Sequence, residues 1–169
     1  GRSWGRLGMN CRYLPLKEFA NIKGGKRLPQ GKLLTPCITE HPYIRVRDLG
    51  RSKVLEITSE CEYIDNETHC KISHYIVHQG DIIISIVGTI GLVAKIGKSL
   101  NKANLTENCA KIVDLHDLDA DFLYYYLSSD SGRCNKSGHS RCCSSKATIK
   151  KYKRIKNSVF YLIHSKSYS

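Results

Sequence analysis

The chain has 169 residues, of which 27 are Lys or Arg and 15 are Asp or Glu, so its formal net charge is +12. This length predicts one domain, or one domain with an appendage, and an apolar content of 41% is enough to build a core. No run of about 18 apolar residues occurs and the N-terminus lacks an apolar signal segment, which argues against a membrane protein or a secreted one. Eight scattered cysteines with no sign of export indicate reduced thiols in a cytoplasmic protein.

The positive charge is unevenly distributed along the chain. All 15 acidic residues lie within residues 1–130 together with 17 basic ones, whereas residues 131–169 carry ten basic residues and no acidic residue. A high positive charge predicts an anionic partner such as nucleic acid or a membrane surface. Here the strong charge belongs to the end of the chain, and the part that is expected to fold is nearly neutral.

The first elements are short. The segment from Leu16 to Ala20 predicts a helical turn, and residues 21–29 predict a basic, glycine-rich loop. Residues 42–47 alternate apolar and basic side chains, which predicts a strand with one buried face and two arginines on the other. The polar and acidic residues 58–71 indicate a loop.

The clearest pattern lies in the middle of the chain. The continuous β-branched run at 82–87 predicts a strand that is buried on both faces. A glycine-bounded connection at 88–91 and a second apolar run at 92–96 follow it, so residues 81–96 predict a hairpin.

Two further elements complete the predicted body. Residues 109–113 form a short apolar run that predicts a strand, and apolar residues near helical spacing predict a helix near 118–128. The predicted fold class is α+β, a mixed and strand-rich domain with a central hairpin and a C-terminal helix. The predicted organisation is an irregular extension at 1–13, a domain at 14–130 and an irregular basic tail at 131–169.

The order of these elements resembles a target recognition domain from the specificity subunit of type I restriction-modification enzymes. The resemblance covers about residues 14–130, and it is strongest where GDIIISIVGTIG is followed at the right distance by ANLTEN and FLYYYL. The motifs that carry it, in chain order, are LKEFANIKGG at 16–25, YIRVRDL at 43–49, GDIIISIVGTIG at 80–91, ANLTEN at 103–108 and FLYYYL at 122–127.

The resemblance implies a sequence-specific domain for double-stranded DNA that reads one half of a bipartite target. It implies no catalytic activity and no cofactor, because in that family the specificity subunit positions methyltransferase subunits and, through them, restriction subunits. Docking helices that follow such a domain would be needed for these partners. Two other hypotheses remain: a fragment of a single-chain restriction-modification enzyme, and a nonspecific nucleic-acid-binding protein that acts through its basic tail.

Two local basic clusters are candidates for DNA contact, since affinity for DNA comes largely from Lys and Arg at phosphates and specificity from contacts to base edges. The first lies at 23–32 without an acidic residue, and the second lies at 45–53 with Asp48 as its only acidic residue. Both could instead be ordinary solvated surface. The candidate residues are Lys23, Lys26, Arg27 and Lys32 in the first cluster and Arg45, Arg47, Arg51 and Lys53 in the second.

Glycine and polar residues add further candidates. Gly24 and Gly25 would let backbone amides approach a phosphate. Thr89 could contact a phosphate, although a hairpin turn explains its glycine neighbours as well. Asn104, Thr106 and Asn108 are candidates for base contact and could equally cap their loop.

Other chemistry has little support in the sequence. Cys and His residues between 61 and 78 fit no familiar zinc spacing, so no metal site is predicted. The sequence also lacks a P-loop, a methyltransferase-like glycine motif and an interpretable nuclease constellation, so no catalytic residues are predicted.

The tail departs from the pattern of the resembling family, in which a segment such as QATVGAVQAKLPLKNIKELKIP would follow the helix. Codons compatible with residues 132–158 can be chosen so that translation one base later gives ADAINQATVGAVQAKLPLKNIKELKIP. We therefore expect the chain to be out of frame from about residue 131. The alternative is a genuine basic arm that binds nucleic acid.

Overall fold

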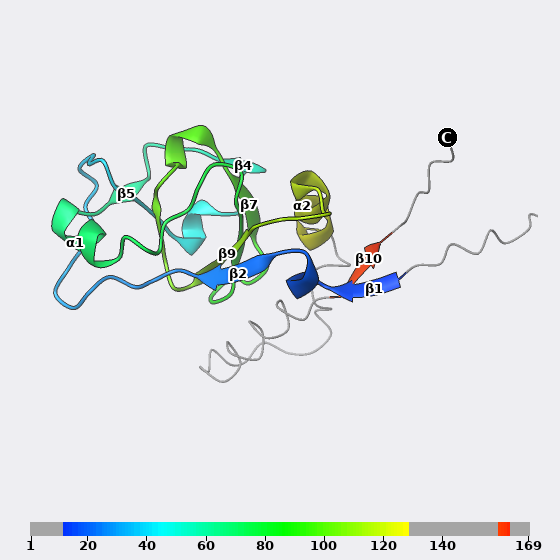
Figure 1. The fold of residues 1–169 in the computed structure, drawn as a ribbon. Coiled ribbons are helices and arrows are strands. Elements are labelled where there is room, and N and C mark those ends of the chain that lie inside the picture. The colour runs from blue at the N-terminus through cyan, green and yellow to red at the C-terminus, as the bar shows by residue number, and fades with distance from the viewer. Residues whose placement is uncertain (1–11, 129–158, 163–169) are drawn as a thin grey trace, which may run out of the picture.

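A computed structural model describes residues 12–128 and 159–162 of the chain. Strand β1 (Arg12–Pro15) pairs antiparallel with β10 (Val159–Leu162), which places Arg12 opposite Leu162 and Pro15 opposite Val159. This two-stranded sheet lies at one end of the molecule, beside α2 (Figure 1). The tail that was expected to be irregular therefore contributes a strand, and the rest of it and residues 1–11 lie outside the described residues.

A five-stranded sheet forms the centre of the domain, in the spatial order β2-β9-β6-β7-β4. Adjacent strands of this sheet run antiparallel, except for β4 and β7, which run parallel to each other. The predicted hairpin is confirmed as β6 and β7, and the predicted strand at 109–113 is confirmed as β9. The strands are β2 (Asn21–Gly24), β9 (Cys109–Val113), β6 (Ile82–Ser85), β7 (Val93–Ile96) and β4 (Val54–Leu55).

Strand β2 occupies the first four residues of the loop that the sequence predicted at 21–29, whereas residues 25–29 are neither helix nor strand. The backbone N–H of Gly25 donates to the carbonyl of Cys109 (3.1 Å), and that of Lys26 donates to the carbonyl of Leu105 (2.8 Å). A Cβ at Gly25 would lie 2.0 Å from the carbonyl oxygen of Thr106, so only glycine fits there. A long-range backbone pairing therefore extends a segment whose local composition indicates a turn.

A three-stranded sheet in the order β5-β3-β8 lies beside the larger one. It consists of β5 (Glu62–Tyr63), β3 (Pro42–Ile44) and β8 (Asn104–Leu105). Helix α1 (Asn66–Lys71) follows β5, and the Asp65 side chain caps it by accepting from the backbone N–H of Thr68. The prediction of a loop over 58–71 was therefore wrong, because a two-residue strand and a capped helix occupy most of residues 62–71.

The predicted strand at 42–47 ends earlier than expected. Strand β3 stops at Ile44, and the 3₁₀ helix η2 (Val46–Asp48) follows it. The carboxylate of Asp48 accepts from the backbone N–H of Arg45 at 2.8 Å and closes this turn. Arg45 and Arg47 consequently leave the sheet on a turn and do not share one strand face.

Two of the remaining helices were expected and one was not. The helical turn predicted at 16–20 is the 3₁₀ helix η1 (Leu16–Glu18), and the C-terminal helix is α2 (Ala120–Ser128); another 3₁₀ helix, η3 (Lys98–Leu100), was not predicted. Helix α2 buries Leu123 and Leu127 in a cluster that also contains Ile82 and Ile84 of β6. No helix within the described ranges is long and apolar enough to cross a membrane.

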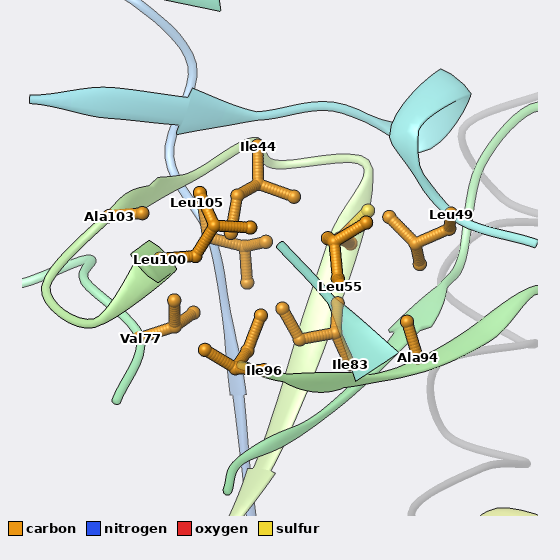
Figure 2. Packing of buried hydrophobic residues seen from close by; sticks show 11 residues of the cluster. Ile44, Leu49, Leu55, Val77, Ile83, Ala94, Ile96, Leu100, Ala103 and Leu105 are labelled. Carbon is orange, nitrogen blue, oxygen red and sulfur yellow. The ribbon is translucent and has the colours of Figure 1, made fainter. Parts of the chain in front are cut away.

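A second cluster covers the opposite face of the central sheet. Alternate residues of a strand point to opposite faces, so Ile83 packs away from Ile82 and Ile84. Figure 2 shows Ile83 beside Ile96 and Leu55, with Ile44 and Leu105 above them. This arrangement confirms that β6 is buried on both faces, and it supports the loops that carry the candidate residues.

Candidate nucleic-acid interface

Three loops that are distant in sequence meet around one open depression of about 400 Å³. The loops are the turn after β3, the turn of the β6–β7 hairpin and the connection between β8 and β9. The residues that line it are Arg45, Val46, Arg47, Leu49, Thr89, Leu92, Thr106 and Asn108. Five predicted candidates are thus brought together: Arg45, Arg47, Thr89, Thr106 and Asn108.

Backbone hydrogen bonds fix these loops to one another. The N–H of Thr106 donates to the carbonyl of Ile44 at 3.1 Å, and the N–H of Ile86 donates to the carbonyl of Asn108 at 2.9 Å. Within the hairpin turn, Gly88 and Gly91 have positive φ angles of 77° and 82°. The glycines around Thr89 are therefore required by the turn itself, and the exposed Thr89 side chain is presented at its tip.

The arginines of the second cluster are held by carboxylates. Glu62 of β5 forms ion pairs with both Arg45 and Arg47. Nη2 of Arg47 lies 3.0 Å from Oε2 of Glu62. Arg47 Nη2 also donates to the backbone carbonyl of Glu60 at 3.1 Å. The side chain of Glu60 in turn pairs with Arg51.

These partners change the charge of the cluster. The sequence places Asp48 alone against Arg45, Arg47, Arg51 and Lys53, whereas the fold adds Glu60, Glu62 and Asp121. Lys95 shares Asp121 with Lys53, so five basic and four acidic groups leave a formal charge of +1. Most of the local excess of positive charge that the sequence indicates at 45–53 is therefore balanced once the chain has folded.

Asp48 lies partly buried beneath this surface. Burial raises its pKa above the ordinary value of 3.8, while the hydrogen bond from the Arg45 N–H and the charges of Arg47 and Arg45 oppose that effect. Its carboxylate caps η2. We therefore assign Asp48 to the support of the arginine turn.

The first basic cluster is divided by the fold. Lys26 and Arg27 are exposed at the start of the β2–β3 loop, where Arg27 Nε lies 3.2 Å from Glu107 and Lys26 Nζ lies 5.7 Å from the ring centroid of Tyr75. Lys23 is exposed on β2, opposite Lys111 of β9. Of these residues, Arg27 contacts the β8–β9 connection through Glu107.

Lys32 lies elsewhere, because its Nζ pairs with Asp65 at 3.3 Å and with Glu67 at 2.6 Å near α1. The sequence also suggested that Gly24 and Gly25 let backbone amides approach a phosphate. The amides of Gly25 and Lys26 already donate to backbone carbonyls, so they are not available to a phosphate.

Lys53 anchors a helix. Its Nζ lies 3.1 Å from Oδ1 of Asp121 in α2, 3.3 Å from the hydroxyl of Tyr125 and 4.5 Å from the centroid of the Tyr125 ring. These contacts tie the start of β4 to α2. These contacts give Lys53 a structural role that does not involve DNA.

Asn104 is placed in the interior. The residue is 0% exposed. Its Oδ1 lies 2.7 Å from Nδ1 of His69, and its Nδ2 donates to the carbonyl of Ile72 at 3.0 Å. This position argues against direct contact with a base. The same ANLTEN segment instead presents Thr106 and Asn108 to the depression.

Glu62 and Glu107 were not identified from the sequence as parts of a site. Glu62 lies in a segment interpreted as a loop, and it reaches the arginines only because β5 pairs with β3. For metal binding, no suitable group of three His, Cys, Asp or Glu side chains occurs in the described part of the chain. His69 instead stacks on His41, with ring centroids 3.8 Å apart.

Comparison with known proteins identifies the class of this domain. The chain has 17% identity to the HsdS subunit from Thermoanaerobacter tengcongensis, with a TM-score of 0.60 over 94% of this chain and 34% of that chain. It has 15% identity to a chain from a structural study of complex assembly and conformational transition in the type I R-M system, with a TM-score of 0.63 over 96% of this chain and 36% of that one. These likenesses show the fold, and this chain spans about a third of the length of each of these chains. No curated protein matches.

The family assignment rests on the sequence. Residues 11–156 match the family model of the type I restriction modification DNA specificity domain, and the chain belongs to that family. The family is the DNA-recognition component of type I restriction-modification systems and is not catalytic. The expected fold class and the expected role in DNA recognition are thereby confirmed.

Proposed function

We propose that this chain reads one half of a bipartite double-stranded DNA target through the surface around the depression. The observation that carries the proposal is the convergence of Arg45, Arg47 and Thr89, from separate loops, on one open hollow beside Asn108. Arginine and asparagine are side chains that discriminate base edges in the major groove. A rigid sheet beneath the loops keeps them in register.

Phosphate contacts are assigned to the neighbouring basic residues. Lys23, Lys26 and Arg27 are exposed, and Arg27 is held only by one partly exposed ion pair with Glu107. Such pairs contribute little stability, so a phosphate can replace the carboxylate. Arg51 does not line the depression and pairs with Glu60, whereas Lys32 and Lys53 are engaged in ion pairs away from the depression.

The test begins with selection of bound sequences from a duplex library with a randomised centre. Binding of the selected duplex is then measured by fluorescence anisotropy for the full chain and for Arg45→Ala, Arg47→Ala and Lys98→Ala. We expect each arginine substitution to weaken specific binding about ten-fold or more. Lys98→Ala removes the same charge from an exposed residue that does not line the depression, and it should change the affinity little.

The proposal would be contradicted if the selection enriched no sequence. It would also be contradicted if Lys98→Ala lost as much DNA affinity as the arginine substitutions. The basic tail offers the competing explanation of nonspecific binding. Deletion of residues 131–169 would also remove β10, the partner of β1, so substitution is the better test. Replacing Lys150, Lys151, Lys153 and Lys156 by Gln should preserve the sequence preference if the body binds DNA, and should abolish binding if the tail does.

Partners are also part of the proposal. Methyltransferase subunits, and through them restriction subunits, would bind if docking helices are supplied. Co-expression with a methyltransferase subunit, followed by size-exclusion chromatography, tests this association. An upstream reading frame that encodes a methyltransferase core in the same frame would instead favour a single-chain enzyme.

A further inference from the structure

One carboxylate holds two arginines at the edge of the depression. Oε2 of Glu62 contacts Nη1 of Arg45 and lies 3.0 Å from Nη2 of Arg47. The Glu62 side chain is 23% exposed, whereas those of Arg45 and Arg47 are 41% and 49% exposed. The acid therefore lies deeper than the two guanidinium groups, which face outward from it.

This arrangement differs from a site that binds phosphate by charge. A phosphate site needs an excess of positive charge, but here the three arginines pair with three carboxylates, those of Glu62, Asp48 and Glu60. A carboxylate limits the positions that a guanidinium group in contact with it can take. Such restriction matters when the partner is a pair of acceptors in a set geometry, such as O6 and N7 of guanine.

The backbone also restricts the two arginines. Arg45 is held by the hydrogen bond from its N–H to Asp48, and Arg47 donates to the carbonyl of Glu60. Glu62 itself is fixed because β5 pairs with β3, which places it opposite Tyr43. The side chains and the backbone thus prepare two guanidinium groups before any DNA is bound.

From this geometry we infer that Arg45 and Arg47 recognise guanine in the target and that Glu62 is a positioning residue that sets this specificity. The inference rests on the proposed DNA-binding function. Glu62 does not contact DNA; it keeps the arginines directed at base edges and its charge opposes their transfer to phosphates. Removing that charge should therefore strengthen nonspecific binding while it weakens discrimination.

The first experiment compares the selected duplex with a scrambled duplex for the full chain, Glu62→Gln and Glu40→Gln. For Glu62→Gln we expect tighter binding to the scrambled duplex and a fall of about ten-fold in the ratio of the two affinities. Glu40→Gln removes the same charge from an exposed residue outside the arginine cluster, and it should leave the ratio unchanged. An unchanged ratio in Glu62→Gln overturns the inference.

The second experiment needs no substitution in the protein, so it applies even if Glu62→Gln folds poorly. Each guanine of the selected duplex is replaced in turn by 7-deazaguanine, which lacks the N7 acceptor. At one position or more, the unchanged chain should bind about ten-fold more weakly, and Arg47→Ala or Arg45→Ala should lose that sensitivity. Absence of any effect overturns guanine recognition alone, whereas failure to enrich any sequence overturns the proposed function.

Discussion

Nζ of Lys53 lies 3.1 Å from Oδ1 of Asp121, and Nζ of Lys95 lies 3.3 Å from the same oxygen. Lys53 precedes the edge strand β4, Lys95 belongs to β7, and Asp121 is in the first turn of α2. One carboxylate therefore joins the last described helix to two strands of the central sheet. Lys53, predicted from the sequence to contact DNA, is used here to orient α2.

We predict that Asp121→Asn lowers the melting temperature near neutral pH by a small amount. The hydrogen bonds from Lys53 and then Lys95 lower the pKa of Asp121 below its ordinary value of 3.8. A lowered folded-state pKa means that the stabilisation is present above the ordinary pKa and is lost as the pH falls through the folded value. The difference in melting temperature between Asp121→Asn and the unchanged chain should accordingly become smaller in strong acid.

Thermal melts followed by circular dichroism across the acid range measure this difference. Asp117→Asn is the matched control, because Asp117 is exposed and has a φ of 54° that asparagine also tolerates. A difference for Asp121→Asn that is independent of pH would contradict the ion-pair explanation.

Two adjacent glycines should differ sharply in their tolerance of alanine. A Cβ at Gly25 would lie 2.0 Å from the carbonyl oxygen of Thr106 and 2.4 Å from that of Leu105, whereas a Cβ at Gly24 would meet no heavy atom within 4 Å. Both obstacles at Gly25 are backbone atoms, so the strands must separate. We expect Gly25→Ala to lower the free energy of unfolding by at least about 1–3 kcal/mol, and Gly24→Ala to have little effect. Urea unfolding of the two variants measures the difference, and equal midpoints would contradict the close approach.

The elements that could be predicted are those determined by local pattern. The β-branched run at 82–87 and the strand at 109–113 can only be buried in a sheet, and the spacing of Leu123 and Leu127 indicates a helix face. Strand β2 was missed because it depends on a distant segment, to which the N–H of Gly25 donates at Cys109. The early end of β3 was missed for a local reason: the carboxylate of Asp48 accepts from the N–H of Arg45 and closes a turn that the alternating pattern does not reveal.

The same distinction applies to the site. Arginines can be counted along a sequence, but the carboxylates that neutralise them come from a segment interpreted as a loop. Asn104 and Asn108 lie in one polar motif, yet the first is completely buried and the second lines the depression. Nothing in the local composition distinguishes the two; Asn104 lies in β8, paired with Tyr43 of β3, whereas Asn108 follows that strand in a loop.

The burial of Asn104 leads to a prediction that separates structure from recognition. Asn104→Ala removes the partners of His69 Nδ1 and of the Ile72 carbonyl, and leaving buried polar groups unpaired costs about 1–3 kcal/mol. We expect a lower free energy of unfolding, with DNA affinity per folded molecule unchanged. Denaturant titration together with binding to the selected duplex tests both parts. A stable variant with weakened DNA binding would restore Asn104 to the interface.

The nucleotide sequence tests the frame of residues 132–158. If the chain leaves its frame near residue 131, the codons starting one base later should encode ADAINQATVGAVQAKLPLKNIKELKIP. The family match reaches residue 156 and includes part of this segment, so the codons are the decisive observation. Codons that do not encode this peptide would leave the basic arm as the remaining explanation.

The final prediction concerns the core that supports the arginine turn. Cys109 is completely buried in the cluster that contains Ile44 and Leu49, and burial, followed by the charges of Asp48 and Glu107, raises its thiol pKa to about 12. Cys37 and Cys70 are exposed. Because the thiolate is the reactive form, iodoacetamide at mildly alkaline pH should label Cys37 and Cys70 and leave Cys109 unmodified until the chain is denatured. Mass spectrometry of the digested protein locates the label. Rapid labelling of Cys109 in the native chain would mean that β9 separates readily from its neighbours, and the loops on either side of it would then be too mobile to hold Arg45 and Arg47 in place.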